Sequence, residues 1–181
     1  MRGAIRESLL RVPSVLPWEA EVLERALAWV DSGGPLIRRV KPGTPSPHLV
    51  CYSAVVDGPW VLLVAHRSAG RWLPTGGHVD ADEAPLQAAK RELREELGLS
   101  LELAWADPVL LTWTETVGAA PSHVDVSLWF AFSGDRHAAL AFDGEEFAQA
   151  RWFHREALPE PTDPFLADFL AKLQSLSSPS A

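Results

Sequence analysis

Apolar residues recur three or four positions apart within residues 2–31, which is the spacing of an amphipathic helix. Pro13 and Pro17 interrupt this pattern, so it predicts two short helices in place of one long helix. Glycine and proline residues then end the second helix and form a turn-rich connector over residues 41–47. We therefore expect an N-terminal helical extension and connector over residues 1–45.

After the connector, β-branched and large apolar residues predict a series of short strands. Asp57 and Gly58 lie between the first two of them, and this dipeptide is typical of a tight turn. The expected strands cover residues 49–56, 60–65, 108–116, 124–132 and 148–153, with a further short strand from residue 71 that runs into a glycine loop ending at residue 78.

Two further helices are predicted at about residues 83–97 and 163–176. Asp80 and Glu83 are placed to form a capping box at the start of the first, and Gly98 is placed to end it. A helix inserted among mixed strands predicts an α/β (α+β) fold, namely an α/β/α sandwich with a mixed central sheet, and disfavours a doubly wound parallel sheet. The expected division of the chain is the extension at 1–45, one domain at 46–176 and a frayed C-terminus at 177–181.

Composition narrows the function. The 181 residues carry a formal net charge of −8 and a pI near 5.2, so a general basic surface for nucleic acid is not expected. Cys51 is the only cysteine, which excludes an internal disulfide and is compatible with a reducing compartment. No apolar run approaches membrane-spanning length. We therefore expect a cytoplasmic protein that binds a small molecule and neither a membrane nor nucleic acid.

The helix predicted at 83–97 carries a cluster of acids. At about 100° per residue, Glu92, Glu95 and Glu96 fall within one narrow sector, away from the apolar stripe that packs the helix. Clustered carboxylates repel one another unless a cation lies among them, and hard oxygen ligands suit Mg²⁺ or Mn²⁺. The alternative is a solvated face paired with the neighbouring cations Lys90, Arg91 and Arg94.

The spacing around these acids favours the metal-binding interpretation. The order is Gly77, five residues, Glu83, seven residues, Arg91-Glu92-Leu93, one residue, Glu95-Glu96, one residue, and Gly98-Leu99. Such a match has odds on the order of one in a billion by chance. It is a complete Nudix box, and over residues 46–176 the chain resembles the Nudix hydrolase superfamily, within which Gly76-Gly77-His78 looks like a subgroup of undefined substrate.

The resemblance implies a role for each box residue. Glu95 and Glu96 match the family's metal-ligand pair, and Glu92 matches a carboxylate that serves as ligand or as general base. The backbone carbonyl of Gly76 matches a position that can join the metal shell. We group Arg91 with the three acids as a catalytic residue. It matches the family's arginine that forms a supporting ion pair with the glutamate at the position of Glu83. Gly77, Glu83 and Gly98 are then structural supports.

Several residues outside the box are weaker candidates. In family members a later loop often supplies another metal-binding acid, and either Glu145 or Glu146 is placed to do so, although a solvated loop is an equal alternative. His123, beside Asp125, could contact substrate or metal, or form an ordinary surface pair. The remaining candidates for substrate binding are Arg67, Arg71 and His78, each of which has a purely structural or solvated alternative.

The resemblance implies a Mg²⁺- or Mn²⁺-dependent hydrolase that cleaves a pyrophosphate bond in a nucleoside diphosphate linked to another moiety. A nucleotide sugar, an ADP-ribose-like compound and a nucleoside triphosphate all remain open as substrates. One alternative is a Nudix-fold sensor that binds a nucleotide or sugar ligand without cleaving it, although such proteins usually have a damaged box. A distant alternative is an isomerase of the isopentenyl diphosphate type, whose catalytic cysteine has no counterpart at Thr75-Gly76. The N-terminal helices either support a homodimer or cap the core.

Overall fold

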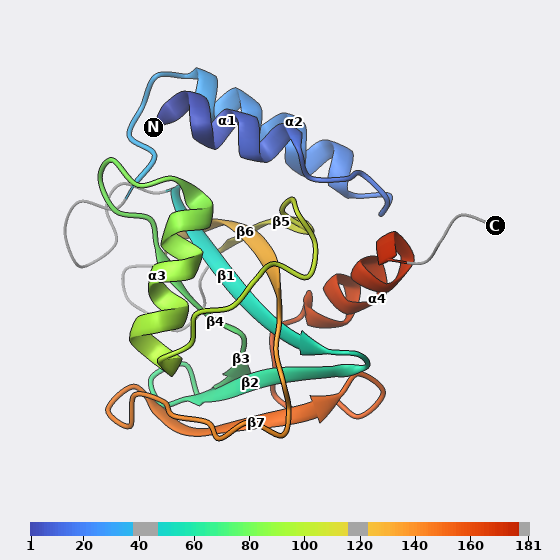
Figure 1. The fold of residues 1–181 in the computed structure, drawn as a ribbon. Coiled ribbons are helices and arrows are strands. Elements are labelled where there is room, and N and C mark those ends of the chain that lie inside the picture. Colours follow the sequence, from blue (N-terminus) through green and yellow to red (C-terminus); the bar gives the residue numbers. More distant parts are fainter. Residues whose placement is uncertain (38–46, 116–122, 178–181) are drawn as a thin grey trace.

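The computed structural model describes residues 1–37, 47–115 and 123–177 of the chain (Figure 1). It contains the helices α1 (Arg2–Leu10), α2 (Glu19–Asp31), α3 (Pro85–Leu97) and α4 (Leu166–Ser177). The strands are β1 (His48–Asp57), β2 (Trp60–His66), β3 (Arg71–Leu73), β4 (Thr75–His78), β5 (Leu110–Glu115), β6 (Val124–Ser133) and β7 (Phe147–His154). None of the described helices is both long enough and apolar enough to cross a membrane.

The strands form one mixed sheet. Its main path runs β3-β2-β1-β6-β5, while β4 pairs with β1 and β7 pairs with β2. The pairing of β1 with β6 is parallel, and the other pairings among these strands are antiparallel. The prediction of a mixed central sheet is therefore confirmed.

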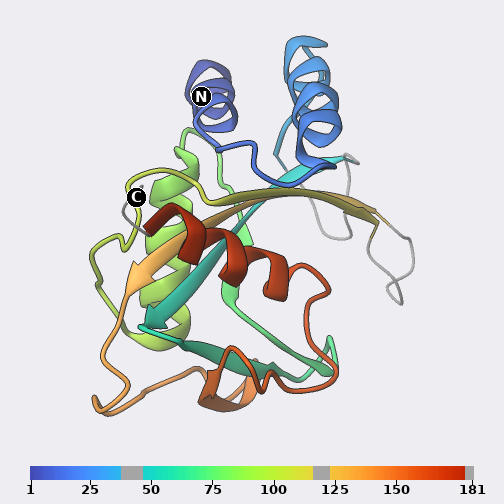
Figure 2. The ribbon, with the colours of Figure 1, turned by 90° about the vertical axis from the view of Figure 1, so that its right-hand side faces the viewer.

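Helices cover both faces of this sheet, which makes the α/β/α sandwich that the sequence predicted. Figures 1 and 2 show α3 on one face of β1 and α4 on the other. Successive residues of β1 face opposite sides. Cys51 accordingly joins the apolar cluster that contains Leu93 of α3, whereas Ala54 joins the cluster that contains Phe169 of α4.

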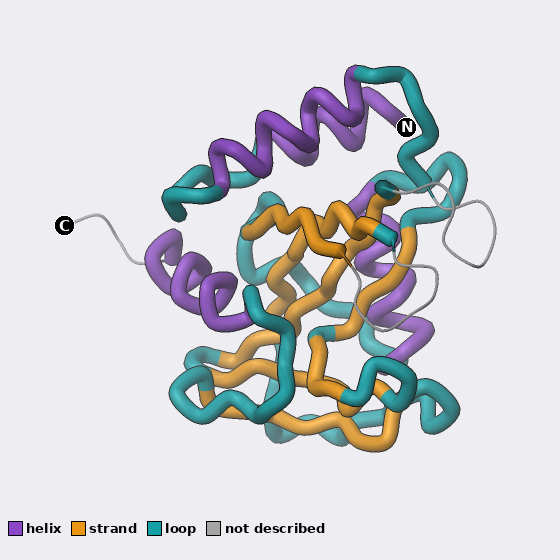
Figure 3. The backbone as a smooth tube through the Cα atoms, turned by 180° about the vertical axis from the view of Figure 1, so that it is seen from behind, coloured by secondary structure: helices purple, strands orange, loops and turns teal. Residues whose placement is uncertain are grey.

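The N-terminal extension forms the two predicted helices, and both pack on the domain core. Ile5 and Leu9 of α1 and Ala26 and Val30 of α2 are fully buried in the same apolar cluster as α3. Figure 3 shows α1 and α2 lying across one end of the layer of strands. The helices therefore cap the core. The connector at 38–46 lies outside the described residues, so the domain boundary near residue 45 stays a prediction, as does a homodimer.

Two local predictions were wrong. The expected glycine loop is in fact the strand β4, because the backbone of Gly76 and Gly77 pairs with β1 at Tyr52 and Cys51. The helix expected from residue 83 begins at Pro85, whose fixed φ and missing N–H suit a first helical position.

The start and end of the helices follow from local chemistry. In the turn before α3 the Glu83 carboxylate accepts a hydrogen bond from the Asp80 N–H at 3.2 Å, so this pair orders the turn and does not cap the helix. Gly98 ends α3 in the left-handed conformation, at φ 65°, as predicted. The last helix begins at Leu166, after Asp163 has formed a turn by accepting a hydrogen bond from the Phe165 N–H.

A buried ion pair joins the N-terminal extension to the last helix. Lys172 of α4 donates a hydrogen bond to Glu19 at the start of α2, and the two side chains are 0% and 3% exposed. The second carboxylate oxygen of Glu19 accepts hydrogen bonds from the N–H groups of Val15 and Leu16, both at 2.7 Å. Burial lowers the pKa of Lys172, and Glu19 opposes that shift. The pair is therefore satisfied only while both partners are present.

We expect Glu19→Ala to destabilise the protein by about 3–5 kcal/mol, because it leaves the ammonium group of Lys172 buried without a counter-charge. Urea unfolding measures this loss. The double variant Glu19→Ala/Lys172→Met should recover part of it. The control is Arg6→Gln, which removes an exposed ion pair with Asp31 and should cost less than about 1 kcal/mol. Equal losses in Glu19→Ala and Arg6→Gln would contradict this assignment.

Candidate active site on helix α3

The three predicted acids differ in exposure, although they share one side of α3. The side chain of Glu92 is 15% exposed and that of Glu95 is 61% exposed, whereas Glu96 as a residue is 6% exposed. The apolar stripe of the helix, which includes Ala89 and Leu93, is buried against β1. Glu95 therefore extends into solvent, whereas Glu92 and Glu96 lie close to the packed surface.

Arg91 binds the acids, the preceding turn and strand β4 together. Its Nη1 lies 2.7 Å from Glu92 Oε1 and 3.1 Å from Glu95 Oε2. Its Nε and Nη2 each donate to one carboxylate oxygen of Glu83 at 3.1 Å, and Nη2 also donates to the carbonyl oxygen of His78 at 2.9 Å. These carboxylates raise the pKa of Arg91 above its already high value, so its charge is permanent.

Two glycines allow β4 to lie against both β1 and the acids. A Cβ atom on Gly76 would come within 2.3 Å of the carbonyl oxygen of Cys51, so any other residue would push the strands apart. A Cβ atom on Gly77 would come within 2.3 Å of Glu92 Oε1. The N–H of Gly76 donates to Glu96 Oε2 at 3.0 Å. The glycines thus place the backbone of β4 directly beside two of the carboxylates.

The two less exposed acids are held in a setting that disfavours their charge. Burial raises the pKa of Glu96 to about 9, the charges of Glu92 and Glu146 add to this shift, and the hydrogen bond from Gly76 opposes it. Burial also raises the pKa of Glu92, against the effect of Arg91. A proton or a cation relieves this repulsion. The donor set of carboxylates therefore fits a hard divalent ion such as Mg²⁺.

The later acidic loop approaches this cluster through one of its two candidate acids. The charge of Glu146 contributes to the raised pKa values of both Glu92 and Glu96. Its side chain also pairs with His66 at 3.3 Å. Glu145 instead donates its N–H to Asp143 Oδ1 at 2.8 Å. Of the two, Glu146 is the better candidate for a further ligand.

The predicted arginines lie beside a hollow at the edge of the sheet. Arg67 and Arg71 both line a hollow of about 340 Å³ together with Trp72. The Nε of Arg67 donates to the carbonyl oxygen of Gly144, and its N–H donates to that of Glu146. Arg67 is therefore linked to the acidic loop.

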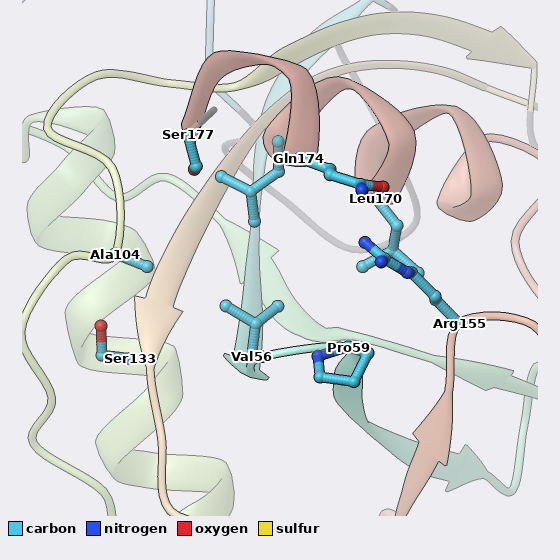
Figure 4. A pocket seen from close by; sticks show the side chains of 10 residues that line it. Val56, Pro59, Ala104, Ser133, Arg155, Leu170, Gln174 and Ser177 are labelled. Carbon is cyan, nitrogen blue, oxygen red and sulfur yellow. The ribbon is translucent and has the colours of Figure 1, made fainter. Parts of the chain in front are cut away.

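A larger hollow of about 360 Å³ lies elsewhere, between α4 and the end of β1. Figure 4 shows Arg155 and Gln174 at its rim. No acid of α3 lines this hollow, so its size alone gives it no role in the chemistry of the α3 carboxylates.

The two predicted histidines do not join the acids but lie together on another surface. His78 Nε2 is 3.0 Å from His48 Nε2, and His123 Nε2 is 3.5 Å from Asp125 Oδ1. Sequence reasoning missed His48, because only the register of β1 with β6 places it opposite Asp125. The contact of His78 with the α3 network is made by its backbone carbonyl oxygen.

The fold and the site define a class of protein before any relative is considered. An α/β/α sandwich carries the complete box of acids, arginine and glycines, and these residues converge at β4 and α3. A family model described as the NUDIX domain matches residues 47–173. The chain therefore belongs to the Nudix family, and its class is that of the Nudix pyrophosphohydrolases.

Known proteins support this assignment. An uncharacterized Nudix hydrolase, YfcD of Salmonella typhi, is 31% identical over 134 residues, which cover 70% of this chain and 68% of that protein. The crystal structure of a MutT Nudix hydrolase from Burkholderia pseudomallei is 26% identical, with a TM-score of 0.56 over 68% of this chain and 95% of that chain. The dihydroneopterin triphosphate pyrophosphohydrolase of E. coli is 18% identical, with a TM-score of 0.58 over 78% of this chain and 97% of that chain, and shares the fold.

We expect the metal-free protein to lose stability as the pH rises from about 4.3, where Glu96 ionises in the unfolded chain, to about 9, where it ionises in the folded chain. Between these values the folded state binds the additional proton, so raising the pH favours unfolding. Thermal melts of the EDTA-treated protein at several pH values measure the slope. Glu96→Gln should flatten it, and the exposed control Glu24→Gln should keep it.

The same melts test the fit of a cation. Added Mg²⁺ should raise the melting temperature of the wild-type protein more at about pH 8.5 than at about pH 5.5, because protons compete with the cation for the carboxylates. An identical pH slope in wild type and Glu96→Gln would show that Glu96 is not the group responsible.

Proposed function

We propose that this protein is a Mg²⁺- or Mn²⁺-dependent hydrolase that cleaves the pyrophosphate bond of a nucleoside diphosphate linked to another moiety, or of a nucleoside triphosphate. The observation that carries this proposal is the placement of two carboxylates with raised pKa values against the backbone of β4, with Glu92 beside Gly77 and Glu96 beside Gly76. A structural ion-pair surface would not gather more carboxylates than its cations neutralise, because the repulsion among the carboxylates costs stability.

The residues proposed to hold the ion are the carboxylates of Glu92, Glu95 and Glu96 and the carbonyl oxygen of Gly76, with Glu146 as a further ligand. A divalent ion bound there would neutralise charge on the pyrophosphate and lower the pKa of water. The side chains of the box hold one another in place. One guanidinium nitrogen of Arg91 binds both Glu92 and Glu95, and Glu83 in turn binds Arg91. The box acids are thereby held ready before substrate binds, which limits the reorganisation needed during the reaction.

Glu92 is the residue we propose as general base. Its carboxylate touches Arg91 on one side and lies against Gly77 on the other. Burial raises its pKa, which makes it a stronger base than an exposed glutamate. Glu95 is the most exposed of the three, so it is suited to binding and less suited to proton transfer.

Substrate binding is proposed for Arg67 and Arg71, which line one hollow beside the loop that carries Glu146. Guanidinium groups bind phosphate oxygens through paired hydrogen bonds. The base and the leaving group contact variable loops, so the choice among nucleotide sugars, ADP-ribose-like compounds and nucleoside triphosphates requires experiment.

A substrate panel tests the proposal. Nucleotide sugars, ADP-ribose, nucleoside triphosphates and dinucleoside polyphosphates are incubated with the protein and Mg²⁺ or Mn²⁺, and released phosphate products are measured. We expect metal-dependent turnover of at least one compound, and a fall in kcat of at least about a hundredfold in Glu95→Gln, as is usual when a group that stabilises transition-state charge is lost. Glu24→Gln, the same substitution at an exposed position of α2, should keep wild-type activity.

Other outcomes select the alternatives. Binding of a panel compound without turnover would favour a sensor. Conversion of isopentenyl diphosphate without release of phosphate would favour the isomerase. Turnover that is unchanged in Glu95→Gln would reject the proposed role of the box carboxylates.

A further inference from the structure

A second cluster of metal-binding side chains lies on the sheet, apart from the α3 acids. His48 begins β1, His78 ends β4, and Asp125 lies near the start of β6. Both β4 and β6 pair with β1, and His48 lies directly opposite Asp125 in the register. One ligand atom from each of these three residues lies within 4.8 Å of the other two, and His48 is fully buried.

The spacing of the ligand atoms fits direct coordination. His48 Nε2 lies 3.0 Å from His78 Nε2 and 3.0 Å from Asp125 Oδ1. Two ligands that each lie 2.0–2.2 Å from an ion, at angles of 90–110°, are roughly 2.8–3.6 Å apart. The separations therefore match those of neighbouring ligands on one ion.

Hydrogen bonding among these groups does not account for the arrangement. One imidazole nitrogen carries at most one proton, so His48 Nε2 cannot donate to both of its neighbours. Asp125 Oδ1 is buried and accepts no hydrogen bond of normal geometry from the described residues, although His48 Nε2 is 3.0 Å away. A buried carboxylate oxygen without a donor is costly unless a cation lies beside it.

A third histidine extends the cluster. The rings of His78, His48 and His123 form a stack with His48 in the middle, with centroid separations of 4.9 and 5.0 Å. His123 Nε2 lies 3.5 Å from Asp125 Oδ1, and its side chain is 14% exposed. His123 therefore borders the cluster from the side of His48 opposite His78, and it is not one of the three residues whose ligand atoms lie within 4.8 Å of one another.

We propose that His48, His78 and Asp125 bind one divalent transition-metal ion of the zinc type. Imidazole nitrogens favour Zn²⁺ and its neighbours in the first transition row, whereas Mg²⁺ favours oxygen ligands. The ion differs in chemistry from the one proposed for the α3 carboxylates, and the site does not depend on that proposal.

The ion would stabilise the strand on which the α3 acids depend. The side chain of His78 joins the histidine cluster, whereas its carbonyl oxygen accepts a hydrogen bond from Arg91 at 2.9 Å. Gly76, two residues earlier in β4, donates to Glu96. An ion that links β4 to β1 and β6 therefore fixes the backbone beside the α3 carboxylates.

Metal content tests the site. The full chain, without a histidine tag, is stripped with a chelator, dialysed against Zn²⁺ in a large excess of Mg²⁺, and analysed for bound zinc. We expect one equivalent in the wild-type protein. His48→Gln and Asp125→Asn should each weaken zinc binding at least about tenfold. Mutation of a residue that only hydrogen-bonds to a metal ligand already lowers metal affinity by about that factor, and these two residues are proposed as ligands themselves. The control His154→Gln, at a partly exposed ion pair with Glu156, should keep the zinc.

Further measurements separate this site from the α3 carboxylates and from misfolding. Glu95→Gln should keep the zinc equivalent whether or not it retains activity. Replacement of Zn²⁺ by Co²⁺ in the unsubstituted chain should give the intense visible absorption of a four-coordinate site with nitrogen ligands, and this readout needs no variant. Failure of the wild-type chain to bind zinc, or zinc binding that is unchanged in His48→Gln and Asp125→Asn, would overturn the proposal.

Discussion

The guanidinium group of Arg91 holds the box residues in one arrangement, and the geometry of the site depends on it. Its donors reach the turn before α3 through Glu83, the helix itself through Glu92 and Glu95, and strand β4 through the carbonyl oxygen of His78. A planar group with five fixed donors can bind several acceptors at once, which an ammonium group on a flexible stem does less well. The positive charge also offsets part of the repulsion among the acids.

Close approach of the backbone is the second constraint. Gly76 allows β4 to lie against β1 at Cys51, and Gly77 leaves room for the carboxylate of Glu92. The cost is that Glu92 and Glu96 are partly withdrawn from water, and burial raises their pKa values. The same withdrawal strengthens their attraction for a cation. Under the proposed function the same acids would hold the divalent ion, so the feature that weakens the metal-free fold would also suit the chemistry.

Strand β4 has two chemically different surroundings. Its backbone contacts the oxygen-rich network of α3 at Gly76 and His78, whereas the side chain of His78 lies among nitrogen ligands with His48. Hard divalent ions such as Mg²⁺ prefer the oxygen donors, and borderline ions such as Zn²⁺ bind well to the imidazole nitrogens. One short strand would thus be fixed from two sides. The N-terminal helices add a cap at one end of the sheet, where Glu19 and Lys172 form their buried pair.

Features encoded over short stretches of sequence could be predicted, and features that need distant segments to meet could not. The spacing of Glu92, Glu95 and Glu96 predicted that they lie on one side of a helix, because helical geometry fixes which neighbours share a face. Strand β4 was mistaken for a loop because glycine has no preference of its own, and its pairing with β1 decides its conformation. The cluster around His48 and the approach of Glu146 to α3 depend on strand register and loop packing, which join residues far apart in the chain. Sequence alone therefore determined helix α3 and the side on which its acids lie, because both depend on near neighbours in the chain, and only the tertiary structure decided which strands and loops lie beside that helix.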